Sequence, residues 1–358
     1  MKILRLTTLL DFGGIETKMA NLSTYNDKQN DWVFVALGKG GEAEKKIRAN
    51  GKRVQVLGLD YKIPSIKTIW KFYKFLKKEK PDVLHTSGAE ANFFGFFSGK
   101  LAGVPKIIVE EIGIPKHSQK ARPIFQYIFR NADWAVGESS EVVQHIISQF
   151  GLQSSKTTVI YNFGLFNYDL STIKAENKNN EFRMLMISRL EAVKNIEGVL
   201  NVVEILVKEN QTKIRLTIAG SGNSEPELKQ KVKDLKLEDS VEFAGFINDP
   251  YPYLLNSDLY ILNSHSEGFS NSLVEAMYSK TPSLSTAVGA APEIIEDGKN
   301  GFMVPPDDEE ALYEKIKAIV ALPKEKLDKI GLAGHEKIVR NFSLENHVNE
   351  LMKIYRNP

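Results

Sequence analysis

Short apolar runs alternate with longer segments of helical periodicity along nearly the whole chain. Residues 32–37 and 184–187, for example, are almost entirely apolar, and each run is followed by a polar or glycine-containing loop and then by a helix-like segment. Strands that alternate with helices of about 10–15 residues are typical of parallel α/β sheets. Because 358 residues exceed the size of one ordinary domain, we predict two doubly wound, Rossmann-like domains. Their predicted bounds are 1–166 and 182–340, with a polar linker at 167–181.

The composition restricts the class of protein. The chain contains no cysteine, which excludes a disulfide framework and a thiolate metal site. No apolar run approaches the roughly 20 residues of a membrane-spanning helix. The first apolar run, residues 3–10, contains Arg5 and is followed at once by Asp11, without a small-residue cleavage site. We therefore interpret it as a strand and not as a secretion signal, and we expect a cytoplasmic protein.

Charge is distributed unevenly between the two predicted domains. Residues 1–165 carry 24 of the 47 Lys and Arg residues and 15 of the 45 Asp and Glu residues, a formal charge of +9, which leaves −7 for the rest of the chain. A basic half joined to an acidic half indicates an anionic surface or partner for the basic half. An ordinary fluctuation in the number of solvated lysines is the alternative.

One predicted helix, residues 63–80, combines aromatic side chains with many lysines. Its periodicity places an apolar stripe toward the sheet, while Phe72 and Phe75 fall outside that stripe, among the lysines. Aromatic side chains between lysines suit an anionic membrane surface. A solvated helix with two partly buried phenylalanines fits the pattern equally well. The predicted sheet-facing stripe comprises Ile66, Ile69, Trp70, Tyr73 and Leu76.

The loop between an apolar run at 259–262 and a helix predicted from about Ser270 carries Glu267 and Gly268. In open α/β sheets, ligands bind outside the carboxyl ends of strands, where helix N-termini present N–H groups and a dipole that favour an anion. Gly268 leaves room for a phosphate near the backbone. Glu267 and Glu275 flank this cradle. Glu275 also fits a capping box with the serine three residues before it, and Glu267 alone is compatible with a solvated loop.

Two cations lie in the loop that follows the run at 184–187. Arg189 and Lys194 are expected at the carboxyl end of that strand, toward the same crevice as Glu267. Arginine offers a bidentate fork and lysine a point charge, and both bind phosphate well. Without further context, two surface cations would be the safer interpretation.

The seven residues between Glu267 and Glu275 match a known spacing. The spacing resembles the E-x7-E motif of the retaining glycosyltransferases of family 4, and the resemblance covers nearly the whole chain, most densely over residues 182–305. It implies the GT-B fold, in which two Rossmann-like doubly wound domains face each other across a cleft. It also implies that a C-terminal helix within 342–358 packs back on the first domain.

The resemblance further implies a donor site and a mechanism. Glu267 would fix hydroxyls of the transferred sugar, and Glu275 would bind the ribose hydroxyls of a nucleotide diphosphate sugar, predicted to be a UDP-sugar. Arg189 and Lys194, whose R-x4-K spacing resembles the pyrophosphate-binding pair of the family, would neutralise the departing diphosphate. A phosphate oxygen of that group would act as the base, so Glu267, Arg189 and Lys194 are the predicted catalytic residues. The predicted donor contacts, besides Arg189 and Lys194, are Gly13, Gly14, Gly220, Phe246, Gly268, Phe269, Ser270, Asn271, Ser272, Leu273 and Glu275.

The chain departs from the family at the end of the strand predicted at 107–109. Many members carry a histidine there that contacts the transferred sugar, whereas this chain has Glu110 and Glu111. One of these carboxylates, or His117 from the following loop, would take its place on the acceptor side. His85 ends the preceding predicted strand and is a further acceptor-side candidate, although a histidine at a strand end is more often structural.

The resemblance thus implies a retaining hexosyltransferase. No D-x-D element of the kind that metal-dependent transferases use stands out, so neither a metal nor another cofactor is expected. The predicted acceptor is a hydroxyl of a glycan or polyprenyl-linked molecule in cell-surface polysaccharide biosynthesis, with the basic domain near an anionic membrane surface and no role for nucleic acid. A nucleotide-sugar epimerase, which would need an additional base, and a non-enzymatic sugar-binding protein are the alternatives. The sugar, the nucleobase, the acceptor and the linkage stay open.

Overall fold

The structure is a computed structural model, and it shows two compact units. The first unit comprises Met1–Phe163 and Leu344–Pro358, and the second comprises Gly164–Ser343. The chain therefore passes from one unit to the other twice. His117 and most of the predicted linker, residues 172–180, lie outside the described residues, which are 1–114, 118–171, 181–209 and 212–357.

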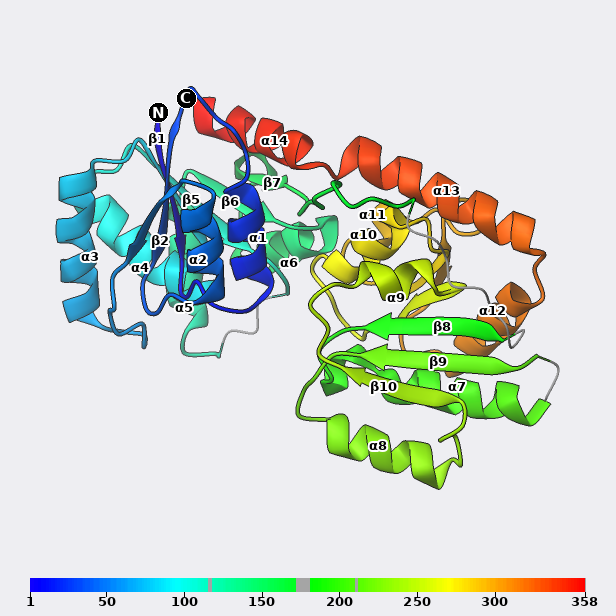
Figure 1. Ribbon diagram of the computed structural model, residues 1–358. Helices are drawn as coiled ribbons and strands as arrows, with labels where there is room; N and C mark the ends of the chain where they lie inside the picture. The colour runs from blue at the N-terminus through cyan, green and yellow to red at the C-terminus, as the bar shows by residue number, and fades with distance from the viewer. Residues whose placement is uncertain (115–117, 172–180, 210–211, 358) are drawn as a thin grey trace. The chain divides into compact units, whose positions relative to one another are not determined.

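The first unit is built on a parallel sheet with helices on both faces (Figure 1). Its central strands are largely buried, as a parallel sheet covered on both faces requires, whereas the two edge strands are partly exposed. The strand order is β3-β2-β1-β4-β5-β6-β7, so the direction of winding reverses between β1 and β4. The strands are β1 Lys2–Thr7, β2 Asp31–Ala36, β3 Arg53–Val56, β4 Val83–Ser87, β5 Lys106–Glu111, β6 Trp134–Gly137 and β7 Thr157–Val159.

Local sequence explains where several helices of the first unit begin and end. The Ser139 side chain accepts a hydrogen bond from Val142 N at the start of α6, an ordinary N-cap. Helix α6 ends at Gly151, which adopts the left-handed conformation that favours glycine. The helices are α1 Gly14–Leu22, α2 Glu42–Ala49, α3 Ile66–Glu79, α4 Ala89–Ala102, α5 Arg122–Asn131, α6 Ser140–Phe150, the 3-10 turn η1 Ser154–Lys156 and α14 Leu344–Arg356.

Helix α3 buries a different face from the predicted one. Thr68, Phe72 and Leu76, spaced four residues apart, form its buried stripe, and Phe72 is fully buried. The predicted sheet-facing stripe is wrong for Ile66 and Trp70, which are 83% and 53% exposed. Phe72 lies at the middle of the helix, where its large ring can be enclosed, whereas Ile66 lies in the first turn. Lysines flank both stripes, so the charge pattern did not distinguish them.

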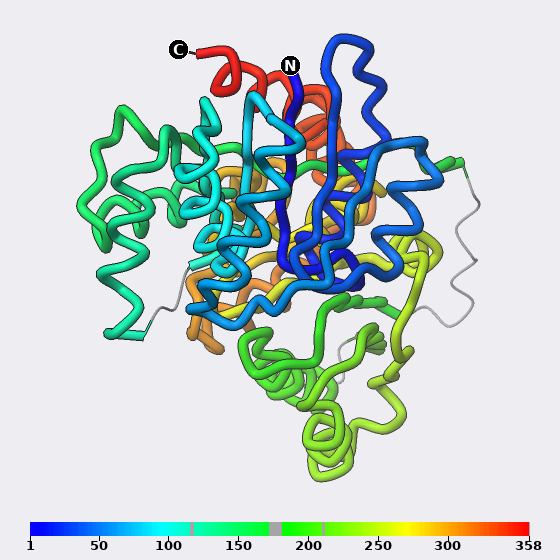
Figure 2. Tube along the Cα trace, turned by 90° about the vertical axis from the view of Figure 1, so that its left-hand side faces the viewer, coloured from blue at the N-terminus to red at the C-terminus, as the bar shows by residue number. Residues whose placement is uncertain are grey.

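The C-terminal helix α14 completes the first unit beside the N-terminal strand, and the two ends of the chain lie close together (Figures 1 and 2). Its buried face includes Val348, Leu351 and Tyr355. The Tyr355 hydroxyl lies 3.0 Å from Arg5 Nη1 of β1, so the last helix is bonded to the first strand.

The second unit repeats the doubly wound arrangement (Figure 1). Its strand order, β10-β9-β8-β11-β12-β13, reverses between β8 and β11. One large apolar core joins the strands to helices α7, α8, α12 and α13. The two-domain α/β fold predicted from the sequence is therefore confirmed. The strands are β8 Phe182–Ile187, β9 Ile214–Ala219, β10 Val241–Gly245, β11 Leu259–Leu262, β12 Ser283–Thr286 and β13 Phe302–Val304.

Most helices of the second unit connect one parallel strand to the next. Their bounds are η2 Ala192–Lys194, α7 Ile196–Glu209, α8 Glu225–Asp234, α9 Tyr251–Leu255, α10 Asn271–Tyr278, α11 Ala291–Ile294, α12 Glu309–Val320 and α13 Lys324–Asn341. Of the helices in the described residues of both units, none combines the length and the apolar character that a bilayer span needs.

Candidate functional site

The loops after β8 and β11 meet where the strand order of the second unit reverses. In open α/β sheets, this reversal opens a crevice at the carboxyl ends of the strands. Two hydrogen bonds join the loops: His265 N donates to the Val193 carbonyl oxygen (2.9 Å), and Asn263 Nδ2 donates to the Asn195 carbonyl oxygen (3.0 Å). Asn195 adopts a left-handed conformation, which asparagine tolerates better than most residues. The two walls of the crevice are therefore held in a fixed register.

Within these joined loops, the structure brings Lys194 and Glu267 together. Lys194 Nζ lies 2.5 Å from Glu267 Oε1, and both side chains are largely buried, with exposed fractions of 15% and 13%. Ser264 Oγ donates to the same carboxylate oxygen at 2.7 Å. Glu267 is therefore fixed and charge-compensated, and the interpretation of it as a solvated loop residue does not hold.

Helix α10 starts immediately after this pair. Ser270 is its N-cap, and the Ser270 hydroxyl accepts a hydrogen bond from Leu273 N. Ser272 Oγ, in the first turn, accepts from the buried Tyr260 hydroxyl of β11 (2.7 Å). Behind the loop, Gly289 has φ of 56°, and a Cβ there would lie 2.6 Å from the Gly268 carbonyl oxygen. The loop that carries Gly268 therefore packs directly on the backbone at Gly289, where only glycine fits.

Glu275 lies in the second turn of α10. Because the N-cap is Ser270, the capping-box interpretation of Glu275 is wrong. Burial, and to a smaller extent the charge of Asp249, raises the pKa of Glu275 to about 7. Within the described part of the chain, no hydrogen bond to this carboxylate is found. A desolvated carboxylate of this kind is a strong acceptor for hydroxyl donors of a ligand.

The loops after β8 and β9 approach each other closely. Gly220 has φ of 137°, and a Cβ at this position would lie 1.8 Å from the Ser188 carbonyl oxygen, so only glycine fits. Arg189 follows Ser188 and is exposed. Its guanidinium makes no hydrogen bond or ion pair with the described residues. After β10, Phe246 is 66% exposed. Arg189 and Phe246 are therefore accessible groups at the carboxyl ends of β8 and β10, the two strands that flank β9.

In the first unit, Gly13 and Gly14 form the turn between β1 and α1, beside the reversal of strand order between β1 and β4. Both glycines are exposed, and Gly13 has φ of 152°. A Cβ at Gly14 would meet open space, whereas the Glu16 carboxylate lies against Gly13, so a ligand can approach the backbone closely at Gly14.

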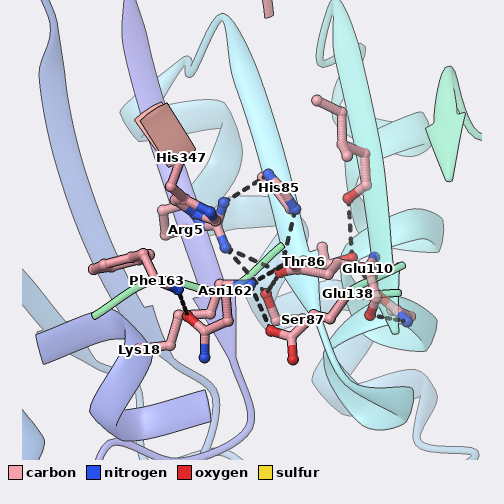
Figure 3. A network of polar contacts seen from close by, with 12 residues as sticks. Arg5, Lys18, His85, Thr86, Ser87, Glu110, Glu138, Asn162, Phe163 and His347 are labelled. Carbon is pink, nitrogen blue, oxygen red and sulfur yellow. Dashed lines mark hydrogen bonds and ion pairs between the residues drawn. The ribbon is translucent and has the colours of Figure 1, made fainter. Parts of the chain in front are cut away.

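Two acceptor-side candidates of the first unit, Glu110 and His85, are buried in a polar network (Figure 3). Glu110 Oε1 lies 2.6 Å from Lys18 Nζ, and Glu110 Oε2 accepts from Ser87 Oγ (2.5 Å) and Arg5 Nη2 (3.1 Å). Burial opposes ionisation of Glu110, but Lys18 and the other donors outweigh it and hold the pKa of Glu110 well below its ordinary value. Because its oxygens are occupied by protein donors, Glu110 contributes to structure and not to substrate contact.

His85 belongs to the same network. Arg5 Nη1 lies 2.7 Å from His85 Nδ1, and because a guanidinium can only donate, Nδ1 is the acceptor and the ring proton lies on Nε2. Burial and the Arg5 charge lower the pKa of His85 to about 3, so the imidazole is neutral. Tyr355 of α14 closes the network, 2.7 Å from the same Nδ1. His85 is therefore a structural residue.

Glu111 is the remaining described candidate on the acceptor side. It is 5% exposed, and its Oε1 accepts a hydrogen bond from Asn92 Nδ2 at 3.0 Å. Burial and the neighbouring Glu110 raise the pKa of Glu111 to about 8, so the carboxyl is largely protonated at neutral pH. Among the described residues, no group of three or more potential metal ligands is found.

The sequence analysis missed several members of the network, among them Lys18, Glu138 and Tyr355. Besides its contact with Glu110, Lys18 Nζ donates to Glu138 Oε1 at 2.7 Å. Only Arg5 carried a usable signal, because a charge inside an otherwise apolar central strand requires a buried partner. The partners themselves come from positions up to 350 residues away, and no local pattern identifies them.

Comparison with known proteins agrees with the two-domain fold. Residues 12–163 match the family described as Glycosyltransferase Family 4, and residues 170–337 match the family described as Glycosyl transferases group 1. The first match lies within the first unit and the second within the second unit.

Individual relatives are distant. N-acetyl-alpha-D-glucosaminyl L-malate synthase of Bacillus anthracis is 30% identical over 203 residues, 55% of this chain and 52% of the relative, so the alignment spans about half of each. An N-acetylgalactosamine-N,N'-diacetylbacillosaminyl-diphospho-undecaprenol 4-alpha-N-acetylgalactosaminyltransferase of Campylobacter jejuni is 24% identical over 286 residues, 74% of this chain and 77% of the relative. The crystal structure of Anabaena Alr3699/HepE with UDP has a TM-score of 0.83 at 20% identity over 99% of both chains, a likeness of fold.

Since the two family matches together account for nearly all of both units, this chain belongs to the two-domain glycosyltransferases of the GT-B fold that combine a family 4 domain with a group 1 domain.

Proposed function

We propose that this glycosyltransferase moves a hexose from a UDP-sugar to a hydroxyl of a glycan or lipid-linked acceptor, with retention of the anomeric configuration and without a metal ion. The observation that carries the proposal is the Lys194–Glu267 ion pair at the N-terminus of α10, with the half-buried Glu275 one turn further along the helix. This arrangement offers adjacent sites for a diphosphate, a sugar hydroxyl and a ribose diol.

Lys194 connects the first two of these sites. An ammonium group has three N–H donors, and in the structure one of them is directed to Glu267 Oε1. The remaining donors would bind phosphate oxygens, so one cation would hold both the diphosphate and the carboxylate that fixes the sugar. Arg189, exposed in the same loop, would supply a second positive charge. As the sugar–phosphate bond breaks, these charges would stabilise the negative charge on the departing diphosphate.

Helix α10 would bind a phosphate at its N-terminus and the ribose at Glu275. Its N-terminal N–H groups and dipole favour a phosphate at Ser270–Ser272. Glu275 would accept hydrogen bonds from both ribose hydroxyls, which would compensate for its burial. The exposed loop at Phe246 would contact the base. UDP is favoured as the leaving group because the Anabaena protein of the same fold was solved with UDP and with UDP-glucose.

Retention would follow from the use of the leaving group as the base. An oxocarbenium-like species would form as the diphosphate departs, and the acceptor hydroxyl would enter on the same face, transferring its proton to a phosphate oxygen. A retaining hydrolase instead places two carboxyl groups about 5–5.5 Å apart around the scissile bond. We expect the anomeric carbon of the product to keep the donor configuration by NMR, and an inverted product would refute this mechanism.

Metal independence is tested separately. Arg189, Lys194 and the helix terminus would carry the charge that a divalent ion neutralises in metal-dependent transferases. We expect the purified enzyme to keep its turnover after dialysis against EDTA. A loss of turnover that Mg²⁺ or Mn²⁺ restores would show that these groups are insufficient.

The acceptor is proposed to be lipid-linked and to be reached at the cytoplasmic face of a membrane. The names of two relatives, in Campylobacter jejuni and Escherichia coli, specify diphospho-undecaprenol acceptors. On this chain, Ile66 and Trp70 are exposed on α3, and Lys74 Nζ lies 5.6 Å from the Trp70 ring centroid. Lysines beside exposed apolar side chains favour an anionic bilayer surface.

Liposome flotation tests this surface. Wild-type protein should float with vesicles that contain anionic lipid and not with purely zwitterionic vesicles. Trp70→Ala should reduce flotation, whereas Phe72→Ala should not weaken binding per folded molecule, because Phe72 is fully buried. Flotation that is independent of anionic lipid would refute the surface.

A single experiment addresses the donor site as a whole. A thermal-shift screen with nucleoside diphosphates and their sugars identifies the donor, because ligands that bind only the native state must stabilise it. The stabilisation should be lost in both Arg189→Ala and Glu275→Gln. A shift of unchanged size in both variants would place the donor elsewhere.

A further inference from the structure

The segment that leads the chain into the second unit, residues 164–171, packs on helix α10 through aromatic rings. Phe166 stacks on Tyr278 of α10, with ring centroids 4.7 Å apart and an interplanar angle of 25°. Tyr278 is 5% exposed, and its hydroxyl donates to the Tyr168 carbonyl oxygen at 3.2 Å. All of these residues belong to the second unit. The segment is therefore attached to the helix that carries Glu275.

The Tyr168 side chain extends this packing to helix α9. Its ring stacks on that of Tyr251, the first residue of α9, with centroids 4.1 Å apart and an interplanar angle of 25°. Tyr251 in turn meets the Tyr278 ring edge-on, with centroids 5.9 Å apart. Aromatic pairs in these two arrangements stabilise each other beyond the area that they bury. Tyr251 is thus held in place by rings from two other elements.

Asp249, just before α9, is held by the same residues. It accepts hydrogen bonds from the Tyr168 hydroxyl and from Tyr251 N, the latter at 3.0 Å. Burial and then the charge of Asp249 raise the pKa of Glu275, and burial and then the charge of Glu275 raise the pKa of Tyr251. Asp249 and Tyr251 are therefore electrostatic neighbours of Glu275. On the β11 side, the fully buried Tyr260 is a further titratable neighbour.

This packing matters because Glu275 is only half-buried. A carboxylate in contact with water gains little from a ligand hydroxyl, since one hydrogen bond is exchanged for another. A carboxylate shielded from water accepts such a bond more strongly. How well Glu275 can bind a ribose therefore depends on the groups that shield it, and Tyr251 is one of them.

We infer that Tyr168 is a positioning residue of the donor site, which holds Tyr251 and Asp249 beside Glu275 and so keeps water from that carboxylate. The inference rests on the proposed donor role of Glu275. Tyr168 acts through Tyr251 and Asp249, so it is not a catalytic residue. The segment that connects the two units would thus also form part of the support of the ribose site.

Three substitutions in the full chain test this inference. Tyr168→Ala removes the ring and the hydroxyl, whereas Tyr168→Phe keeps the ring that stacks on Tyr251. Tyr253→Ala is the matched control, because Tyr253 lies on the same short helix as Tyr251 and is 37% exposed. The Kd for UDP is measured by isothermal titration calorimetry at about pH 8 and at about pH 6, where the ionised fraction of Glu275 differs by about tenfold.

In wild type the Kd should rise by about tenfold from pH 8 to pH 6, in proportion to the loss of ionised Glu275. Tyr168→Ala should reduce this factor to about twofold, because water lowers the pKa of the exposed carboxyl, and should raise the Kd at about pH 8 by about threefold or more. Tyr168→Phe should keep most of the wild-type factor, and Tyr253→Ala all of it. A wild-type factor in Tyr168→Ala, or an equal loss in Tyr168→Phe, would overturn the inference.

Failure of the proposed donor role gives a different result. If Glu275→Gln binds UDP with the affinity and pH dependence of wild type, Glu275 does not hold the donor, and the inference is decided on ligand-free protein. Because the pKa of Glu275 is raised, its contribution to the free energy of unfolding falls between about pH 5 and pH 8. Tyr168→Ala should reduce this fall, and in a Glu275→Gln background it should leave the pH dependence unchanged. A fall of wild-type size in Tyr168→Ala would show that Tyr168 does not shield Glu275.

Discussion

We predict that the Glu275→Gln substitution stabilises the folded protein and weakens donor binding. The pKa of Glu275 rises from its ordinary 4.5 to about 7 in the folded protein. The folded state therefore binds this proton more tightly than the unfolded state, and stability falls as the pH rises through the window between these two values. A rise of this size corresponds to about 3 kcal/mol as an upper bound at about pH 8. Removal of the charge should therefore raise the unfolding temperature at about pH 8 and change it little below about pH 5.

The same substitution should remove a pH dependence of donor binding. If ribose hydroxyls donate to Glu275, only the ionised carboxylate binds well, and between about pH 8 and pH 6 the ionised fraction falls by about tenfold. The Kd for UDP should therefore rise by about tenfold over this interval in wild type. In Glu275→Gln this factor should disappear, and at about pH 8 the Kd should be at least about tenfold higher than in wild type, because hydrogen bonds to a charged group are lost.

Isothermal titration calorimetry measures the Kd for UDP of wild type and Glu275→Gln at each pH. Repeating the titration in two buffers of different ionisation enthalpy also counts the protons released on binding. Near pH 6.5, wild type should release a proton when UDP binds, and the variant should release less. Differential scanning calorimetry of the ligand-free proteins supplies the stability comparison. Equal pH dependence in wild type and variant, or a variant less stable than wild type at about pH 8, would refute the assignment of a desolvated, ligand-accepting carboxylate.

Other substitutions test separate parts of the molecule. Arg189→Ala should leave the unfolding temperature unchanged because the side chain is exposed, and it should raise the calorimetric Kd for UDP by about tenfold or more; unchanged affinity would remove Arg189 from the site. Phe72→Ala should cost about 3–5 kcal/mol of stability and Trp70→Ala less than about 1 kcal/mol, as compared by urea unfolding; equal costs would contradict the orientation of α3. Tyr355→Phe removes the hydroxyl that contacts Arg5 and His85 and should cost about 1–3 kcal/mol, with no cost expected if that network is already broken in solution.

The fold could be predicted because its signal is local and repeated. Each strand of a parallel sheet is buried on both faces, so runs such as 184–187 are apolar regardless of their neighbours. The strand-loop-helix order then places each loop at the carboxyl end of its strand. Lys194 and Glu267 could be assigned to one crevice because their loops follow strands β8 and β11, which are adjacent in the sheet.

Features that depend on competition between residues could not be predicted. On α3, two apolar stripes are nearly equivalent in the sequence, and the choice between them depends on the space that α4 leaves, since Ser98 Oγ of α4 donates to the Ile69 carbonyl oxygen. The capping-box interpretation of Glu275 was plausible because serines occur at both 270 and 272, and only the backbone shows that Ser270 ends the loop.

The buried network of the first unit was hidden for a different reason. Glu110 and His85 stand where the family resemblance predicted acceptor contacts, yet their partners come from distant elements, including Lys18 and Tyr355. An acidic residue at a strand end has the same appearance in sequence whether it faces a ligand or a buried lysine. Only the distances between side chains distinguish the two cases.

The chain passes from the first unit to the second and back again, and this course has a consequence for its synthesis. Residues 1–163 leave the ribosome long before Leu344–Pro358, so the nascent first unit lacks α14, and Arg5 and His85 lack the Tyr355 hydroxyl, until that helix has been synthesised. The second unit is continuous in sequence and can fold as soon as it has emerged. Premature termination before residue 344 would thus yield a finished C-terminal half attached to an unfinished N-terminal half, a species suited to recognition by chaperones or proteases.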